Sequence, residues 1–216
     1  ANEQVTSQQT QLSGTLRVSA AGAFAENHVA AALMTFAKDH PDLTIEMNFN
    51  TKMVNFIEDG IDFAIRYGRL DDSGLVARKL VERPMAAAAS KDYREQFGAP
   101  THPEQLKVHS CIIANSDQWV FEKEGKSLNA VRVHGRWRSK NSSAVLKACE
   151  EGLGVVYLPK SSFNGGLTNG KLVPVLEEYW GAGTSSWVVY QNRRFLPQRA
   201  RLAIDFLISY FSDWNE

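Results

Sequence analysis

Hydrophobic and polar positions repeat one pattern at two distant places along this chain. Residues 54–66 and 145–157 each combine an amphipathic helical stretch with two acidic residues, a glycine and a short apolar run. A glycine just past a helix commonly takes the left-handed conformation that ends it, so Gly60 and Gly152 are expected helix stops. The apolar run after each glycine has the composition of a buried parallel strand. Because a helix that leads into a parallel strand is half of a βαβ crossover, each copy predicts its own open α/β sheet.

The remaining pattern predicts an α/β fold of two Rossmann-like lobes joined by two crossover strands. Residues 83–90 are extended and small, which suits a first crossing, and the apolar run at 186–191 suits the return. Two crossings form a hinge, and the crevice between hinged lobes is the expected ligand site. The expected division is a tail or frayed helix end at 1–13, a first lobe at 14–89 and 186–216, and a second lobe at 90–185.

Charge and composition narrow the classes of function. The 216 residues include 24 acidic and 24 basic side chains, whereas a nucleic-acid-binding domain usually has a strongly basic balance. No stretch approaches the roughly 20 apolar residues of a membrane helix, and the first residues are too polar for a secretory leader. We therefore expect a cytoplasmic chain with no membrane partner.

Signatures of catalysis and metal binding are missing from the sequence. It has no Gly-x-Ser-x-Gly elbow, no phosphate-binding glycine loop that ends in Lys-Ser or Lys-Thr, and no His-Glu-x-x-His. The histidines share no metal-ligand spacing. Cys111 and Cys149 lie in apolar stretches typical of buried free thiols, with a redox-sensing pair as the alternative. No enzyme activity, metal or cofactor is expected.

Helix beginnings and strand ends are the expected binding elements. In α/β lobes ligands bind at the carboxyl ends of strands, where helix N-termini present free N–H groups to anions. Residues 20–24 and 141–143 both precede helices, although the second group can serve as an N-cap alone. Arg66, at the end of a strand, can bind a carboxylate or form a structural ion pair with Asp62 or a neighbouring acid. These alternatives stay open at the level of sequence.

Four motifs in order resemble LysR-type transcriptional regulators. They are residues 14–20, 58–68, 72–80 and 151–159. The resemblance covers only the effector-binding part of that family, whose fold is similar to type II periplasmic binding proteins. It implies that residues 1–13 are the remnant of a linker helix and that the parent protein binds promoter DNA through an N-terminal winged helix-turn-helix absent from this sequence. It also implies dimers, and tetramers at full length, with helix 29–38 of one chain against 143–150 of another.

The resemblance also implies an effector cleft built from both lobes. Ala21 and Ala23 lack the hydroxyl that the family often presents there, so a larger or more apolar effector competes with a small anionic metabolite. Residues 157–159 are expected to line the same cleft, and Trp119 adds an aromatic wall unless it serves only the core. The expected effector-binding residues are Ala21, Gly22, Ala23, Phe24, Thr51, Arg66, Tyr67, Gly68, Asn115, Trp119, Asn141, Ser142, Ser143 and Tyr157.

Three functions compete at this stage. The first is the effector-sensing regulatory domain of a LysR-type regulator, which binds a small metabolite and relays this to the missing DNA-binding domain. A periplasmic-type solute-binding protein with the same fold is the alternative. An enzyme on this scaffold ranks last, because it needs an acid, base or nucleophile with a shifted pKa in the cleft.

Overall fold

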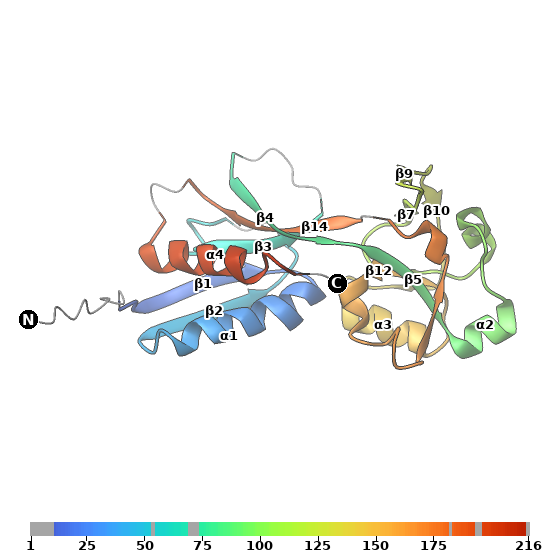
Figure 1. Ribbon diagram of the computed structural model, residues 1–216, viewed down its shortest axis with the longest axis horizontal. Coiled ribbons are helices and arrows are strands. Elements are labelled where there is room, and N and C mark those ends of the chain that lie inside the picture. Colours follow the sequence, from blue (N-terminus) through green and yellow to red (C-terminus); the bar gives the residue numbers. More distant parts are fainter. Residues whose placement is uncertain (1–10, 53–54, 69–73, 182, 193–195, 215–216) are drawn as a thin grey trace, which may run out of the picture.

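The computed structural model describes residues 11–52, 55–68, 74–181, 183–192 and 196–214. They form a mixed α/β fold with two main sheets, which lie side by side along the longest axis of the molecule (Figure 1). We call the residues around the larger sheet the five-stranded unit and those around the smaller sheet the three-stranded unit. Within the described ranges, no helix combines the length and apolarity needed to cross a membrane.

The five-stranded unit contains a parallel core with an antiparallel edge. β1 pairs in parallel with both β2 and β3, while β14 runs antiparallel to β3 and β4. The strong alternation in β2 and the apolar run in β3 explain why both were predictable as strands. In spatial order the strands are β2 (Leu43–Phe49), β1 (Gly14–Ala20), β3 (Phe63–Tyr67), β14 (Thr184–Tyr190) and β4 (Val76–Arg83).

Two helices cover this sheet with apolar stripes. α1 (Ala30–Lys38) buries Leu33 and Phe36, and it follows directly from the single π-helical turn η1 (Ala25–Val29). α4 (Gln198–Tyr210) buries residues at helical spacing, including Ile204 and Leu207. Both stripes join one hydrophobic cluster with the buried side chains of β1, which is how an amphipathic helix gains most of its stability.

The three-stranded unit is built around an alanine-rich central strand. β5 (Met85–Ser90) lies between β12 (Val156–Pro159) and β13 (Leu172–Val175), antiparallel to both. Its alanines alternate between two hydrophobic clusters, one on each face of the strand. The other helices are α2 (Lys91–Phe97), α3 (Ser142–Glu150), η2 (Pro103–Val108), η3 (Lys160–Phe163) and η4 (Glu177–Tyr179). The short strands are β6 (Ile112–Ile113), β7 (Gln118–Trp119), β8 (Glu122–Lys123), β9 (Lys126–Ser127), β10 (Val131–Arg132) and β11 (Trp137–Arg138).

The first copy of the repeated pattern does not form the predicted helix. Residues 55–60 are turns, and residue 54 lies outside the described residues. The Asn55 amide N–H donates to Asp59 Oδ2 at 3.0 Å, and Glu58 N–H donates to Asn55 Oδ1 at 3.4 Å. Such local side-chain bonds compete with the helical ladder and limit the segment to one turn. Gly60 nevertheless ends the turn in the left-handed region, with a φ of 62°.

The second copy has the expected helix but a different strand pairing. α3 stops before Gly152, whose φ of 77° is the left-handed conformation expected there. β12 follows, but its neighbour β5 is antiparallel to it, so the predicted parallel strand is wrong for this pair. A single parallel bridge joins Cys111 to Val155. The chain enters β5 directly from β4 of the other sheet, and this sets the direction of β5. A local sequence pattern does not reveal that direction.

Two chain segments cross between the units. β4 ends at Arg83 and β5 begins at Met85, so the chain changes sheets at Pro84, earlier than the expected boundary after residue 89. The return enters the five-stranded sheet at Thr184, two residues before the expected 186. The crossings touch each other, since Met85 N–H donates to Gly181 O at 3.1 Å. A Cβ on Gly183 would lie 2.3 Å from Met85 Cγ, so only glycine allows this approach.

Candidate functional site

A cavity of about 310 Å³ lies where the two units meet. The ends of β3 and the start of β14 contribute one side, while β5, β12 and the loop before β7 contribute the other. The lining residues are Tyr67, Gly68, Met85, Ala114, Asn115, Ser116, Gln118, Trp119, Val120, Tyr157, Leu158, Pro159, Gly183 and Thr184. The volume is at the lower end of the range typical of small-molecule sites, about 300–1,000 Å³.

Five of the predicted site residues meet in this cavity. They are Tyr67, Gly68, Asn115, Trp119 and Tyr157. They come from three separated parts of the sequence. Tyr67, Gly68, Asn115 and Trp119 follow or form the end of a strand, as the strand-end argument expects, whereas Tyr157 lies within β12. Leu158 and Pro159, expected to line the same place, are also present.

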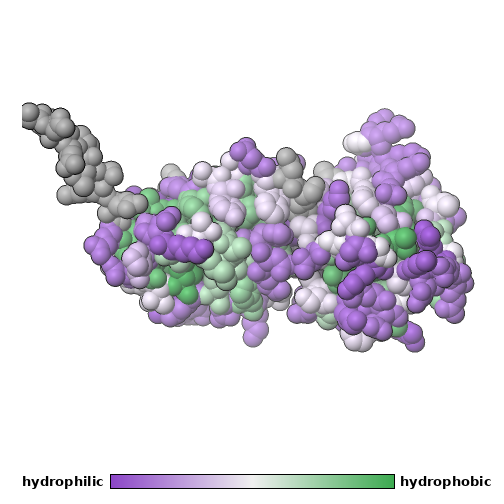
Figure 2. All heavy atoms as spheres, turned by 60° about the horizontal axis from the view of Figure 1, so that its bottom comes forward, coloured by the Kyte–Doolittle hydropathy of each residue, from purple (hydrophilic) through white to green (hydrophobic). Residues whose placement is uncertain are grey.

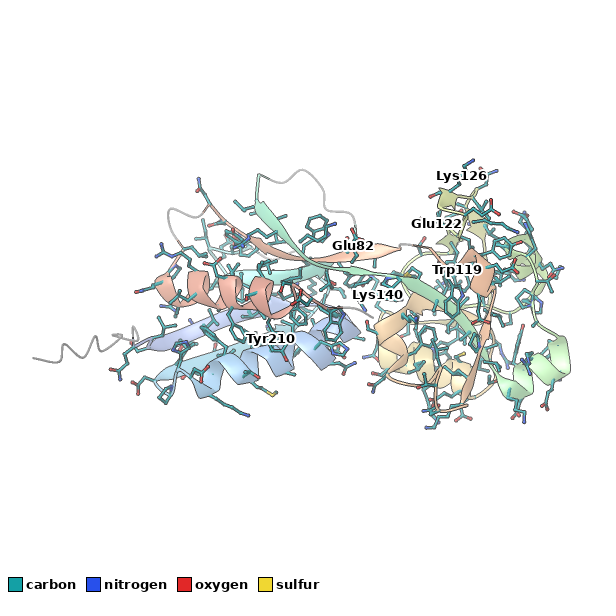
Figure 3. All side chains as sticks on the ribbon, in the orientation of Figure 1. Glu82, Trp119, Glu122, Lys126, Lys140 and Tyr210 are labelled. Atoms are coloured by element: carbon teal, nitrogen blue, oxygen red, sulfur yellow. The ribbon has the colours of Figure 1, made fainter. Side chains whose placement is uncertain are left out.

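An aromatic wall closes the side of the cavity that belongs to the three-stranded unit. The rings of Trp119 and Tyr157 lie 5.6 Å apart, and Tyr157 stacks on Phe121 at 4.4 Å. Trp119 Nε1 donates to Ser116 O at 3.1 Å, and Tyr157 Oη donates to Val120 O at 2.9 Å. Figure 3 shows Trp119 among the side chains of this unit. Trp119 therefore serves both the core and the cavity, so the two readings of this residue are compatible.

The tyrosine hydroxyl in this wall is not a titrating group near neutral pH. Burial raises the pKa of Tyr157 well above its ordinary value, with a further contribution from the negative charge of Glu122. The side chain is 8% exposed. Tyr157 consequently acts as a fixed hydrogen-bond donor to the backbone rather than as an acid or base.

Tyr67 bridges the two units across the cavity. Its hydroxyl donates to Asn115 Oδ1 at 3.2 Å, which connects the end of β3 to the loop before β7. Its ring also covers Gly22, where an added Cβ would lie 3.1 Å from Tyr67 Cε1. Gly22 thus supports the cavity from behind Tyr67, although it does not line the cavity itself.

Arg66 has a different environment from the one predicted. Its guanidinium donates to Ser19 Oγ at 2.8 Å and to the carbonyl oxygens of Ile65 and Lys52 at 2.9 and 3.3 Å. Burial lowers the pKa of Arg66 from its ordinary value. Asp62 instead lies 3.7 Å from an Arg199 guanidinium nitrogen, so the predicted Arg66–Asp62 ion pair is wrong. Arg66 does not line the cavity, and three of its hydrogen bonds go to protein acceptors.

The predicted helix beginnings lie outside this cavity. Ala23, Ser142 and Ser143 line a second hollow of about 220 Å³ between the start of η1 and α3. Asn141 Oδ1 accepts from Ala144 N–H at 2.8 Å, so Asn141 is the N-cap of α3. The remaining predicted residues, Ala21, Phe24 and Thr51, line neither hollow, the first two being buried and the third exposed.

Sequence reasoning missed the contribution of the crossing segments. Met85, Gly183 and Thr184 line the cavity although they belong to the crossings rather than to a strand-end loop. The hydroxyl oxygen of Thr184 is buried and has no hydrogen-bond partner among the described residues. The close pair of glycines beside this threonine was the available signal, because such a pair marks a close approach of backbone.

The described side chains that line the cavity are neutral. They include no Asp, Glu, Lys, Arg or His. In the described part of the chain, no three His, Cys, Asp or Glu side chains gather in an arrangement that could hold a metal ion. Cys111 and Cys149 are free and buried, and burial raises the pKa of each thiol to about 12. Such thiols are poor nucleophiles at neutral pH.

Comparison with known sequences identifies close relatives of one class. A model of the LysR substrate binding domain matches residues 9–212. A helix-turn-helix-type transcriptional regulator of Haemophilus influenzae is 32% identical over 201 residues, which are 91% of this chain and 69% of that protein. LtrA of Klebsiella pneumoniae, a probable regulator of the same type, is 29% identical over 93% of this chain and 67% of its own length. The chain thus spans about two thirds of these relatives.

Two solved structures that resemble this chain belong to the same class. Full-length AphB, a Vibrio cholerae virulence activator and member of the LTTR family, superposes with a TM-score of 0.82 at 27% identity, over 94% of this chain and 70% of that chain. The regulatory domain of CrgA, a LysR-type transcriptional regulator from Neisseria meningitidis, gives a TM-score of 0.80 at 26% identity, over 93% of this chain and all of that chain (100%). The chain therefore belongs to the LysR substrate-binding domain family, and it is the effector-sensing regulatory domain of a LysR-type transcriptional regulator.

Proposed function

We propose that the two units are the lobes of a type II periplasmic-binding-protein-like clamshell and that the 310 Å³ cavity is its effector cleft. The cavity is lined by both sheets and by both crossing segments. A ligand there touches every part that must move when hinged lobes open or close. This shared lining is the observation that carries the proposal.

The proposed effector contacts are the predicted residues that meet in the cavity together with the crossing residues. Tyr67 and Asn115 supply polar groups, and Trp119 and Tyr157 supply the aromatic wall. Ala23, Ser142 and Ser143 form a secondary candidate, because they line the smaller hollow near the start of α3. Arg66 is proposed to support the site by holding Ser19 of β1 to β3 rather than by touching the effector.

The output of this domain is proposed to be a change in the arrangement of the DNA-binding parts of the parent protein. The relatives that this chain resembles are transcriptional regulators, and the parent would bind promoter DNA through a region outside this sequence. Such a regulator works where the chromosome lies, so the cytoplasm is the proposed location. None of the relatives reported above is a periplasmic solute-binding protein, so that alternative is not favoured.

Self-association is proposed to pair α1 of one copy with α3 of another. Figure 2 shows apolar surface on the face of the five-stranded unit that carries α1. Met34 of α1 is 65% exposed there, which is unusual for a large apolar side chain on a helix that already buries its other face. Met34→Glu should therefore shift the chain towards monomer in sedimentation velocity, and an unchanged distribution would count against this pairing.

The effector cleft can be tested by blocking its rim. Val120 lines the cavity and is 46% exposed, so Val120→Trp can fill the opening without disturbing a buried side chain. A ligand present at about 100 times its Kd stabilises the native state by about 2.7 kcal/mol, which a thermal-shift screen of small metabolites detects. Stabilising metabolites should lose their effect on the Val120→Trp variant.

The matched control is Val108→Trp. Val108 is 85% exposed and lies outside the cavity. This variant should keep every thermal shift of the unmodified protein. Metabolites that still stabilise the Val120→Trp variant would place the effector elsewhere, with the hollow beside α3 as the next candidate.

A further inference from the structure

The lining of the cavity between the two units bears on the charge of its ligand. Its 14 described lining residues include no acidic, basic or histidine side chain. An ionised carboxylate that enters such a space loses water and gains no opposite charge, and that loss is large for an unpaired ion. A ligand without net charge avoids this penalty.

Two described cations near the site, Arg66 and Lys140, do not line the cavity. Arg66 already donates to Ser19 Oγ and to two backbone carbonyls, and it lies outside the lining. Lys140 lies where the two units meet (Figure 3), but it is exposed and does not line the cavity either. A carboxylate at the aromatic wall would therefore have no cationic partner among the described lining residues.

The polar groups of the cavity are neutral and partly unsatisfied. Tyr67 uses the carbonyl oxygen of the Asn115 side chain, which leaves the amide NH₂ of Asn115 as a donor. The Thr184 hydroxyl is buried and has no hydrogen-bond partner among the described residues, and Thr184 itself lines the cavity. A buried hydroxyl without a partner is costly, so a ligand that satisfies it gains affinity.

The apolar walls favour a flat ligand body. Trp119 and Tyr157 present aromatic surface, and Met85 and Leu158 add flexible and branched aliphatic surface. Aromatic rings stack on such walls, and methionine adapts to the edge of a ring. The length of the wall and the cavity volume of about 310 Å³ accommodate a molecule of one or two rings.

We propose that the effector is an uncharged aromatic molecule with a neutral hydrogen-bonding group, such as an amide or hydroxyl, that reaches Asn115 and Thr184. This inference rests on the proposed effector cleft and adds the chemical class of its ligand. It predicts selection against the carboxylate that has the same ring.

The test compares matched probes that differ in charge alone. Benzamide and benzoate form one pair, and 2-naphthamide and 2-naphthoate form a second. Each is titrated into the protein at pH 7 by isothermal titration calorimetry and by NMR of backbone amides in the isotopically labelled chain. The amides should bind at least tenfold more tightly than the acids, with shifts at Tyr67, Asn115 and Thr184.

Two pairs of variants test the assigned groups. Thr184→Val removes the hydroxyl at constant shape and should weaken the amides by about three- to tenfold, whereas Thr44→Val, at an exposed strand position outside the cavity, should leave them unchanged. Val120→Lys adds a cation at the rim and should raise the affinity for the acids, whereas Val108→Lys should not.

The outcomes separate this inference from the proposed cleft. If the acids bind more tightly than the amides and shift the cavity residues, the neutral-ligand inference fails while the cleft stands. If the amides bind but Thr184→Val and Thr44→Val behave alike, the assigned hydroxyl contact is overturned. If none of the probes shifts any cavity residue, the inference fails, and the metabolite screen with Val120→Trp then decides separately on the cleft.

Discussion

Replacing Gly183 with alanine should destabilise the protein more than the same replacement at Gly60. Both glycines have nearly the same left-handed backbone, with φ of 65° at Gly183 and 62° at Gly60. Alanine in that conformation costs about 1–2 kcal/mol at either place. The two sites differ in their surroundings, because nothing lies within 4 Å of a Cβ built on Gly60.

The surroundings of Gly183 add a second cost. A Cβ there would lie 2.3 Å from Met85 Cγ and 2.7 Å from Arg83 O, far inside normal contact. Met85 can move, but the carbonyl of Arg83 belongs to the backbone of the other crossing. Overpacking of this kind costs about 1–3 kcal/mol. The free energy of unfolding should therefore fall by about 2–5 kcal/mol for Gly183→Ala and by about 1–2 kcal/mol for Gly60→Ala.

Urea unfolding followed by circular dichroism measures both values by linear extrapolation. In a thermal scan each kcal/mol corresponds to a shift in Tm of roughly 2–4 °C for a chain of this size. Equal losses for the two variants would refute the tight contact between the crossing segments. A larger fall in the free energy of unfolding for Gly60→Ala than for Gly183→Ala would refute the argument that Gly183 has the more crowded surroundings.

Three further outcomes follow from the contacts of single side chains. Tyr67→Phe removes the donor to Asn115, so it should weaken the contact between the units by about 0.5–1.5 kcal/mol and raise the radius of gyration in small-angle X-ray scattering. Arg66→Leu leaves a buried hydroxyl without its donor and should lower the free energy of unfolding by about 1–3 kcal/mol in urea, while amide probes still bind. Burial raises the pKa of the Cys111 and Cys149 thiols from 9.0 to about 12, so the folded chain keeps protons that the unfolded chain releases. The free energy of unfolding should therefore fall as pH rises from about 9 towards 12. Both thiols should also resist a thiol reagent at pH 8 until the chain unfolds.

Much of the five-stranded unit was predictable because its pairing follows the chain locally. β1 pairs in parallel with the two strands that follow it in the chain, β2 and β3, and the alternation of β2 and the apolar run of β3 are visible in the sequence. The helical prediction at 54–60 failed because Asn55 and Asp59 bond to nearby backbone, a competition that a hydrophobic pattern does not register. The direction of β12 also escaped prediction, because its partner β5 arrives from the other sheet.

The residues of the candidate site that lie at strand ends were predictable from the sequence, whereas those on the crossing segments were not. Tyr67 and Asn115 were expected from their positions at strand ends, and Tyr157 from its place at the end of the second repeat; all three line the cavity. Thr184 and Met85 were not, because their place depends on two segments about a hundred residues apart in sequence meeting at one point. Their contact is a long-range property that no local motif carries.

The position of the cavity explains how binding there can change the arrangement of the two units. A ligand shifts a conformational equilibrium only as far as its affinity differs between the two states. A ligand that touches Tyr67 on one side and Tyr157 on the other makes contacts that exist together in one arrangement of the units alone. A typical coupling of about 1–3 kcal/mol requires only one or two such contacts to be lost on opening.

The rigidity of β5, the central strand of the three-stranded unit, confines any movement between the units to the two crossing segments. The alanines of β5 are fully packed between two clusters, with Ala86 and Ala88 on one face and Ala87 and Ala89 on the other. A strand so closely packed on both sides moves as part of its unit rather than bending within it. Any rotation must then occur between Arg83 and Met85 and at the return beside Gly183, which are the segments that border the cavity. In the proposed clamshell, ligand contacts with Met85 and Thr184 therefore act at the two crossings, where rotation between the units would occur.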